Sequence, residues 1–172
     1  PENPDSDFET QWKNLVNDKK LWAVFTRFDK LTRIGRFGAL LLGFDDITVQ
    51  EDLQTEVGTN GTTKSLLYVQ TFGEGSVEIA DYVKDATDER YGLPLMYDLT
   101  LEDPNSNSST SRKLKVHWSR IIHNTEGLLE SNVLGTPALE RVYNRLLNLE
   151  LIVGGSAEMF WQGAFSGYAF IA

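Results

Sequence analysis

Leucine or tyrosine stands at every second position in Leu93-Pro94-Leu95-Met96-Tyr97-Asp98-Leu99-Thr100-Leu101, and this alternation sets the architecture of the chain. A period of two residues is typical of a strand with one apolar face. Residues 113–123 repeat the pattern with Leu114, Val116 and Trp118. The segment between them, 102–111, is rich in serine and asparagine, which favour turns. The sequence therefore predicts an antiparallel hairpin with strands at about 93–101 and 113–123.

Two further strands are expected earlier in the chain. Residues 37–44 are apolar without alternation, a pattern typical of a central strand that is buried on both faces. A long polar segment follows at 45–64, with Asn60-Gly61 as its clearest turn, and a strand is predicted at about 65–72.

Helices are predicted on both sides of these strands. Ser6-Asp7-Phe8-Glu9 has the form of a capping box, so a first helix is expected at about 7–17. An apolar stripe predicts a second helix at about 20–36, ending near Gly35. Thr136-Pro137 can open a last helix that Gly154-Gly155 would break or bend. We expect a single α+β domain over residues 1–172, in which helices pack on a central mixed or antiparallel sheet.

Composition excludes several classes of function. The chain has 172 residues, no cysteine and a formal net charge of −9, so a thiolate metal site is excluded and phosphate binding is disfavoured. The acidic start has no signal-peptide pattern, and no run of about 18 apolar residues could span a membrane. The charge is uneven, however: 19–36 and 112–123 are basic, and 77–103 is acidic. Such alternation is usually solvated surface, but it also suits head-to-tail packing of identical subunits.

The candidates for chemistry are few. His117 and His123 each begin a His-x-Ser/Thr pattern, but on one predicted strand they would lie about 20 Å apart, so we interpret them as surface histidines on the face that also carries Lys115 and Ser119. Asp81, Asp85, Asp88 and Glu89 are interpreted as a solvated acidic face. Gly73-Glu74-Gly75 lacks the lysine and helix of a phosphate loop and is interpreted as a turn. We predict no catalytic residue, no metal site and no cofactor.

The apolar pattern also predicts where the aromatic residues and Arg120 lie. Most of the aromatic residues are expected in the core, because they fall on predicted apolar faces; they are Trp12, Trp22, Phe25, Phe28, Trp118, Phe160 and Trp161. Arg120 occupies a position where alternation requires an apolar residue. A buried arginine needs a carboxylate partner, and we expect that partner between Asp81 and Glu89.

Four segments together resemble one family. Lys115-Val116-His117-Trp118-Ser119-Arg120-Ile121-Ile122-His123 is similar to a strand of tailed-phage portal proteins that ends in a Ser-Arg pair, although a proline commonly precedes that pair where this chain has Trp118. Three other segments resemble the same family, in the same order along the chain; they are 35–42, 134–143 and 154–161. The branch is one formerly described as a domain of unknown function. The resemblance covers roughly residues 21–161.

The resemblance implies a structural subunit of the portal, the head-tail connector ring of a phage or prophage virion. The ring homo-oligomer would contact terminase and capsid or scaffold proteins, with DNA only in its assembled channel and no membrane. The chain would be a wing-like core, cut before the stem, clip and crown, and located in the virion or the host cytoplasm. It would not be an enzyme. Two alternatives stay open: a portal-like N-terminal module of an anti-defence cyclic-oligonucleotide phosphodiesterase, and a prophage-derived interaction domain.

Overall fold

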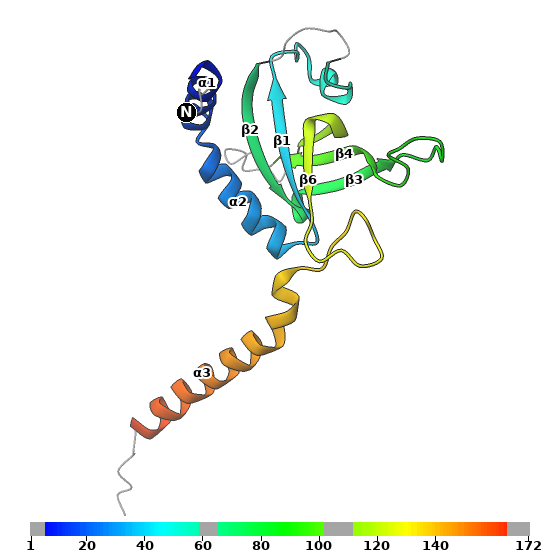
Figure 1. Cartoon of the computed structure of the whole chain (residues 1–172). Helices are drawn as coiled ribbons and strands as arrows, with labels where there is room; N and C mark the ends of the chain where they lie inside the picture. Colours follow the sequence, from blue (N-terminus) through cyan, green and yellow to red (C-terminus); the bar gives the residue numbers. More distant parts are fainter. Residues whose placement is uncertain (1–5, 59–64, 102–111, 165–172) are drawn as a thin grey trace, which may run out of the picture. The chain divides into compact units, whose positions relative to one another are not determined.

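The computed structural model describes residues 6–58, 65–101 and 112–164. The chain divides into two compact units, Pro1–Pro137 and Ala138–Ala172. Figure 1 shows the elements of the first unit, whose two antiparallel three-stranded sheets and helices confirm the predicted α+β class. The predicted turn at Asn60-Gly61 and the Ser/Asn-rich segment 102–111 lie outside the described residues.

The first two helices lie close to their predicted positions. Helix α1 spans Ser6–Asp18 and helix α2 spans Leu21–Ile34, and the backbone N–H of Gly35 closes α2 on the carbonyl of Leu31. Lys20 links the helices in a left-handed backbone conformation, with a φ of 50°. Helix α2 packs on the first sheet through Leu21, Phe28 and Thr32, which are all buried.

The first sheet has the strand order β2-β1-β6. Strand β1 (Gly38–Phe44) is central, as predicted, and it pairs antiparallel with β2 (Leu66–Gly73) and β6 (Ile121–Asn124). A Cβ atom on Gly38 would lie 2.5 Å from Oγ1 of Thr32, so the missing side chain lets α2 approach β1 closely. Both faces of β1 are therefore covered, one by α2 and the other by the second sheet.

The second sheet has the order β3-β4-β5 and contains the predicted hairpin. Strand β4 (Pro94–Leu101) pairs antiparallel with β5 (Arg112–His117), and Leu99 lies opposite Leu114. Strand β3 (Val77–Tyr82) was not predicted from the sequence. The 3-10 helix η2 (Glu74–Ser76) joins β2 to β3, which confirms that Gly73-Glu74-Gly75 forms a turn.

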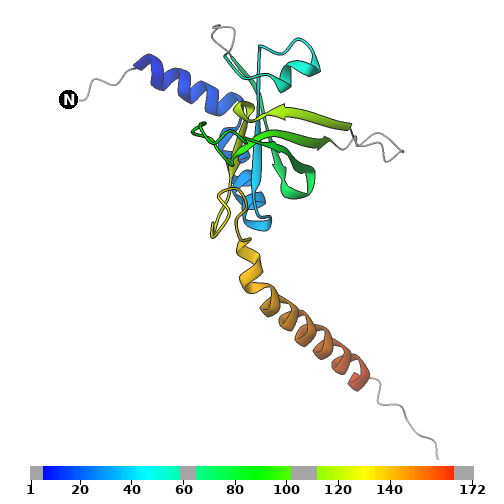
Figure 2. The ribbon, with the colours of Figure 1, turned by 90° about the vertical axis from the view of Figure 1, so that its right-hand side faces the viewer.

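The predicted second strand of the hairpin is divided between the two sheets. Its pairing with β4 ends at His117, one turn of 3-10 helix η3 (Trp118–Arg120) follows, and the chain continues as β6 in the other sheet. His117 and His123 therefore lie on different sheets, and the interpretation of one straight strand carrying both was wrong. This turn brings the sheets together over one core, in which Phe37, Leu41 and Phe72 meet Leu99 and Val116. The strands of one sheet run across those of the other (Figures 1 and 2).

Most of the aromatic residues predicted in the core are exposed. Phe28 is buried and Trp118 packs partly buried against the core cluster, but Trp22 is 70% exposed. The others are exposed as well; they are Trp12, Phe25, Phe160 and Trp161. In α2 the reason is local: the side of the helix that meets the sheet carries Leu21, Phe28 and Thr32, which leaves Trp22 on another side. The prediction that most of these seven aromatic residues lie in the core was wrong.

The second unit contains the predicted last helix. A 3-10 helix η4 (Ala138–Val142) leads into α3 (Tyr143–Ala164). The helix runs through Gly154 and Gly155 without a break. A glycine within a helix costs only about 1 kcal/mol relative to alanine, which a helix can tolerate. The expected break at this pair is therefore absent from α3.

Candidate functional site

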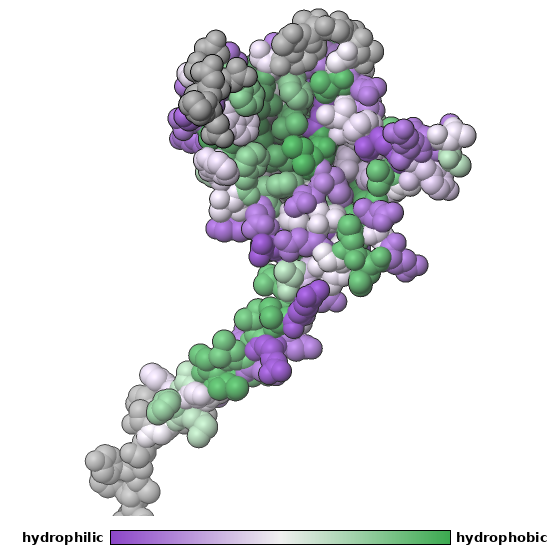
Figure 3. Space-filling model, viewed as in Figure 1, coloured by the Kyte–Doolittle hydropathy of each residue, from purple (hydrophilic) through white to green (hydrophobic). Residues whose placement is uncertain are grey.

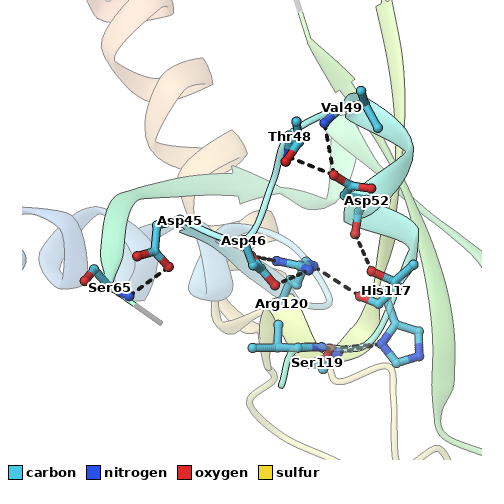
Figure 4. A network of polar contacts seen from close by, with 11 residues as sticks. Asp45, Asp46, Thr48, Val49, Asp52, Ser65, His117, Ser119 and Arg120 are labelled. Carbon is cyan, nitrogen blue, oxygen red and sulfur yellow. Dashed lines mark hydrogen bonds and ion pairs between the residues drawn. The ribbon is translucent and has the colours of Figure 1, made fainter. Parts of the chain in front are cut away.

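Arg120 lies at the junction of the two sheets and is 1% exposed. Its Nη1 and Nη2 atoms donate to the two carboxylate oxygens of Asp46, at 2.8 Å each, and its Nε donates to the carbonyl oxygen of Thr55 at 3.2 Å. Figure 4 shows Arg120 and Asp46 facing one another. The prediction of a buried arginine with a carboxylate partner is confirmed, but the expected partner between Asp81 and Glu89 was wrong. The turn at η3 directs Arg120 toward the segment that follows β1.

The segment 45–57 is held by further contacts around this ion pair. Asp52 accepts hydrogen bonds from the backbone N–H groups of Thr48 and Val49, at 2.8 and 3.0 Å. These bonds hold the pKa of the Asp52 carboxyl below its usual range. The Oγ atom of Ser119 accepts from the N–H of Val57 at 3.0 Å. Together these contacts fix a long connection to the sheet junction (Figure 4).

His117 and Ser119 are brought together at the start of η3. Nδ1 of His117 lies 2.9 Å from Oγ of Ser119, and it also faces the Ser119 N–H at 3.5 Å. The hydroxyl also accepts from the N–H of Val57, so Ser119 ties the 45–57 segment to η3. Burial lowers the pKa of His117, and Glu56 partly opposes that effect. His123, the other predicted surface histidine, instead contacts the carbonyl of Val133 at 2.8 Å.

Three of the four acidic residues, Asp85, Asp88 and Glu89, are exposed in the connection between β3 and β4, and Asp81 lies in β3. The Oδ1 atom of Asp85 accepts from the N–H of Thr87 at 2.9 Å, and Asp88 accepts from the N–H of Arg90 at 2.8 Å. Asp81 pairs with Lys84 at 2.9 Å. Over the described ranges, no group of three or more histidine and acidic side chains could hold a metal ion.

Glu74 fastens the turn between β2 and β3 to the end of α2. Its carboxylate accepts from the backbone N–H of Arg36 at 2.7 Å and pairs with the Arg36 guanidinium. Burial raises the pKa of Glu74, but the hydrogen bonds from Arg36 outweigh it, so the pKa lies below its usual value. The Gly73-Glu74-Gly75 turn thus makes its contacts with Arg36 of the same chain.

The second unit exposes apolar side chains along the whole of α3. Leu149, Ile152, Val153 and Phe160 are between 57% and 80% exposed, and Figure 3 shows apolar residues collected along this helix. A helix that is apolar around most of its circumference is normally enclosed by other protein or by lipid. Within the part of the chain that the structure describes, no helix is long and apolar enough to cross a membrane. The exposed apolar residues make the surface of α3 a candidate contact surface.

The polar contacts described above fasten loops and strands within the first unit, with the buried Arg120 at the junction of the two sheets. A family model described as "Phage portal protein" matches residues 3–170. The chain therefore belongs to the phage portal protein family, as its resemblance predicted. No curated protein matches the chain.

Membership in this family assigns a portal-type structural role. Portal proteins are structural rather than enzymatic, which is consistent with the prediction that the chain is not an enzyme. The family match supports neither the phosphodiesterase module nor the prophage-derived interaction domain, the two alternatives that the sequence left open.

Proposed function

We propose that this chain is a subunit of the portal ring, the head-tail connector through which phage DNA is packaged and ejected. The observation that carries the proposal is the exposed apolar surface of α3 in a chain that belongs to the portal family. Packaging would be driven by a separate terminase, while this chain contributes structure. Its net charge of −9 fits a subunit that meets DNA only in the assembled channel.

Helix α3 would pack between neighbouring subunits. Leu146, Leu149, Val153 and Phe160 follow one another at spacings of three, four and seven residues, which is the heptad pattern of helices that pack side by side. Further apolar residues lie elsewhere on the helix, such as Leu147 and Ile152. Apolar surface on several sides suits a helix that meets more than one neighbour, as each subunit of a ring does.

Charge would guide how the subunits meet. Exposed bases lie on and beside α2, among them Arg27 and Lys30, and the acidic turns at 85–89 lie elsewhere on the same unit. A ring uses head-to-tail contacts, in which two different faces of one subunit meet, so patches of opposite charge favour the correct orientation. Capsid or scaffold proteins and terminase would bind the assembled ring rather than the single subunit.

We further propose that residues 1–172 are one wing-like module of a longer portal protein, with stem, clip and crown elsewhere in that protein. The whole protein would then be located in the virion and, during assembly, in the host cytoplasm.

The proposal is tested on the full-length portal protein. Leu149→Glu combined with Val153→Glu places two charges on the heptad positions of α3, and Asn148→Glu places a charge at a neighbouring exposed polar position. Rings seen by electron microscopy should persist in the Asn148→Glu variant and disappear in the double variant, while circular dichroism shows that both stay folded. Unchanged rings in the double variant, or an unmodified full-length protein that stays monomeric at high concentration, would contradict the proposal.

A further inference from the structure

A cavity of about 410 Å³ lies in the first unit, where β4 and β6 come together beside η3. Most of the side chains in its lining are apolar, among them Leu93, Tyr97, Trp118 and Ile121. The polar ones are Arg90, His123, Thr125 and Asn132. The lining that these described residues form contains no carboxylate. A cavity of this size with apolar walls and a few polar groups is typical of small-ligand sites.

Arg90 brings a positive charge to this lining, and the charge has no acidic partner among the described residues. Of the arginines that the structure describes, only Arg120 and Arg90 are not exposed. Asp46 neutralises Arg120, whereas no ion pair joins Arg90 to a described acidic side chain. The charge acts on the cavity wall: burial raises the pKa of Tyr97, and the positive charge of Arg90 partly opposes that effect. A partly buried charge without a partner is unfavourable, so this site favours an anion.

Contacts with two lining residues hold the Arg90 guanidinium at the cavity wall. The guanidinium carbon lies 3.5 Å from the centroid of the Trp118 ring, and Nη2 donates to the carbonyl oxygen of Pro94 at 3.1 Å. The backbone is fixed as well, because Asp88 accepts from the N–H of Arg90 at 2.8 Å. No described residue accepts a hydrogen bond from Nε or Nη1, and of these two atoms Nε is buried while Nη1 is accessible. Nη1 is therefore the donor that a ligand in the cavity can reach.

We propose that the cavity binds the terminal carboxylate of a partner polypeptide, together with the apolar side chain of its last residue. The carboxylate accepts hydrogen bonds from Nη1 of Arg90 and neutralises the guanidinium. The apolar side chain packs against the wall that Leu93 and Ile121 form. This inference does not depend on ring assembly, because the cavity and all of its lining lie in the first unit.

A chain terminus fits the cavity better than other sources of negative charge. It joins a carboxylate and an apolar side chain on one carbon atom, as the cavity joins one guanidinium to an apolar wall. The side chain of an aspartate or glutamate brings the charge without that apolar group. A phosphate carries up to two charges, while the lining offers one arginine, and the exposed Asp88 and Glu89 beside Arg90 repel a double charge more strongly than a single one.

The test is a nuclear magnetic resonance titration of the chain with N-acetyl-leucine and with the matched N-acetyl-leucinamide at pH 7.5. N-acetyl-leucine should shift the indole N–H signal of Trp118 in a saturable way, because this ring lies against the Arg90 guanidinium. The neutral amide differs only in its terminal group and should bind at least about tenfold more weakly. N-acetyl-glutamate α-amide, whose carboxylate is on the side chain, and inorganic phosphate are titrated in parallel, and both should bind more weakly than N-acetyl-leucine.

Two variants make the test specific. Arg90→Gln removes the charge at the cavity and should weaken binding of N-acetyl-leucine by about tenfold or more. Arg33→Gln removes the charge of an exposed arginine outside the lining and should leave binding unchanged. Thermal denaturation checks that both variants are folded.

If Arg90→Gln does not fold, the unmodified chain is titrated at low and at high salt, where added salt should weaken binding of N-acetyl-leucine more than that of its amide. Four results would each overturn the proposal: no saturable shift, equal binding of N-acetyl-leucine and its amide, tighter binding of phosphate or of the side-chain carboxylate, or full binding by a folded Arg90→Gln protein. A salt effect that is the same for both leucine compounds would overturn it as well.

Discussion

Arg120 and Asp46 form a buried bidentate pair, with both guanidinium Nη atoms 2.8 Å from the two carboxylate oxygens. Their side chains are 1% and 9% exposed, and they lie 74 residues apart in the chain. The pair joins the turn between the two sheets to the segment after the central strand. Its geometry satisfies both charges, so the loss of one partner would leave the other buried and uncompensated.

We therefore expect Arg120→Met to lower the free energy of unfolding by about 3–5 kcal/mol. Arg33→Met is the matched control, because Arg33 pairs with Asp29 at 3.2 Å while both side chains are 56% exposed, and such pairs contribute about 1 kcal/mol or less. Urea denaturation of both variants measures the difference. Equal effects of the two substitutions would show that the loss of a partner from the buried pair costs no more stability than its loss from an exposed pair.

Gly38 provides a second prediction, on packing. A Cβ atom at this position would lie 2.5 Å from Oγ1 of Thr32 and 3.2 Å from the ring of Phe28, and both residues are buried on α2. Gly38→Ala should therefore lower the free energy of unfolding by about 1–3 kcal/mol, because α2 must move away from β1. Gly75→Ala is the control, since a Cβ atom there meets nothing within 4 Å. A Gly38→Ala protein as stable as the unmodified one, by thermal and urea denaturation, would refute this account of the contact.

Local sequence patterns predicted individual strands of this fold. The alternation at 93–101 corresponds to β4, and the apolar run at 37–44 corresponds to β1. Both could be predicted because the spacing of apolar residues along a strand shows which of its faces are buried. Strand β3 was missed because the alternation of Val77, Glu78 and Ile79 is short and Asp81 interrupts it. The period also continued past Trp118 without indicating that the chain turns there into another sheet.

Contacts between distant segments could not be predicted in the same way. The position of Arg120 within an apolar pattern signalled a buried charge, but its partner depends on the direction of η3, which no local pattern specifies. The cavity was not predicted for the same reason: Arg90 and His123 each have an ordinary sequence context, and only the packing of the two sheets brings them to one lining. The family resemblance was the one sequence signal of function, and the family match confirmed it.

Substitution by alanine should have a large effect on stability at Trp118 and a small one at Trp22. Trp118 is partly buried, packs against the core and lies beneath the Arg90 guanidinium, so Trp118→Ala should lower the free energy of unfolding by roughly 2–4 kcal/mol. Trp22 is 70% exposed, and Trp22→Ala should change it by about 0.5 kcal/mol or less. Urea denaturation of both variants is the measurement. A large effect at Trp22 would mean that this surface is covered in solution, for example by a second copy of the chain.

The lowered pKa values of His117 and His123 predict that the first unit loses stability in mild acid. Burial lowers the pKa of His117, and it also lowers the pKa of His123 against the opposing hydrogen bond to Val133, in each case from an ordinary value of 6.5. Between the folded and unfolded values the unfolded chain binds more protons, so stability rises with pH in that window. The contribution is complete above pH 6.5 and is lost as the pH falls through the folded values.

The measurement is the urea midpoint at intervals from pH 8 to pH 5, together with histidine ring signals that report each folded pKa directly. His117→Asn removes one titrating group while its amide oxygen can still accept from Ser119, so the decline in mild acid should become shallower. A further loss should follow at lower pH, because hydrogen bonds hold the pKa of Asp52 and of Asp85 below the ordinary value of 3.8. For these carboxyl groups the stabilising contribution is present above that value and disappears below it. A stability that stays constant from pH 7 to pH 5, or histidine pKa values above 6.5, would contradict the burial of these two rings.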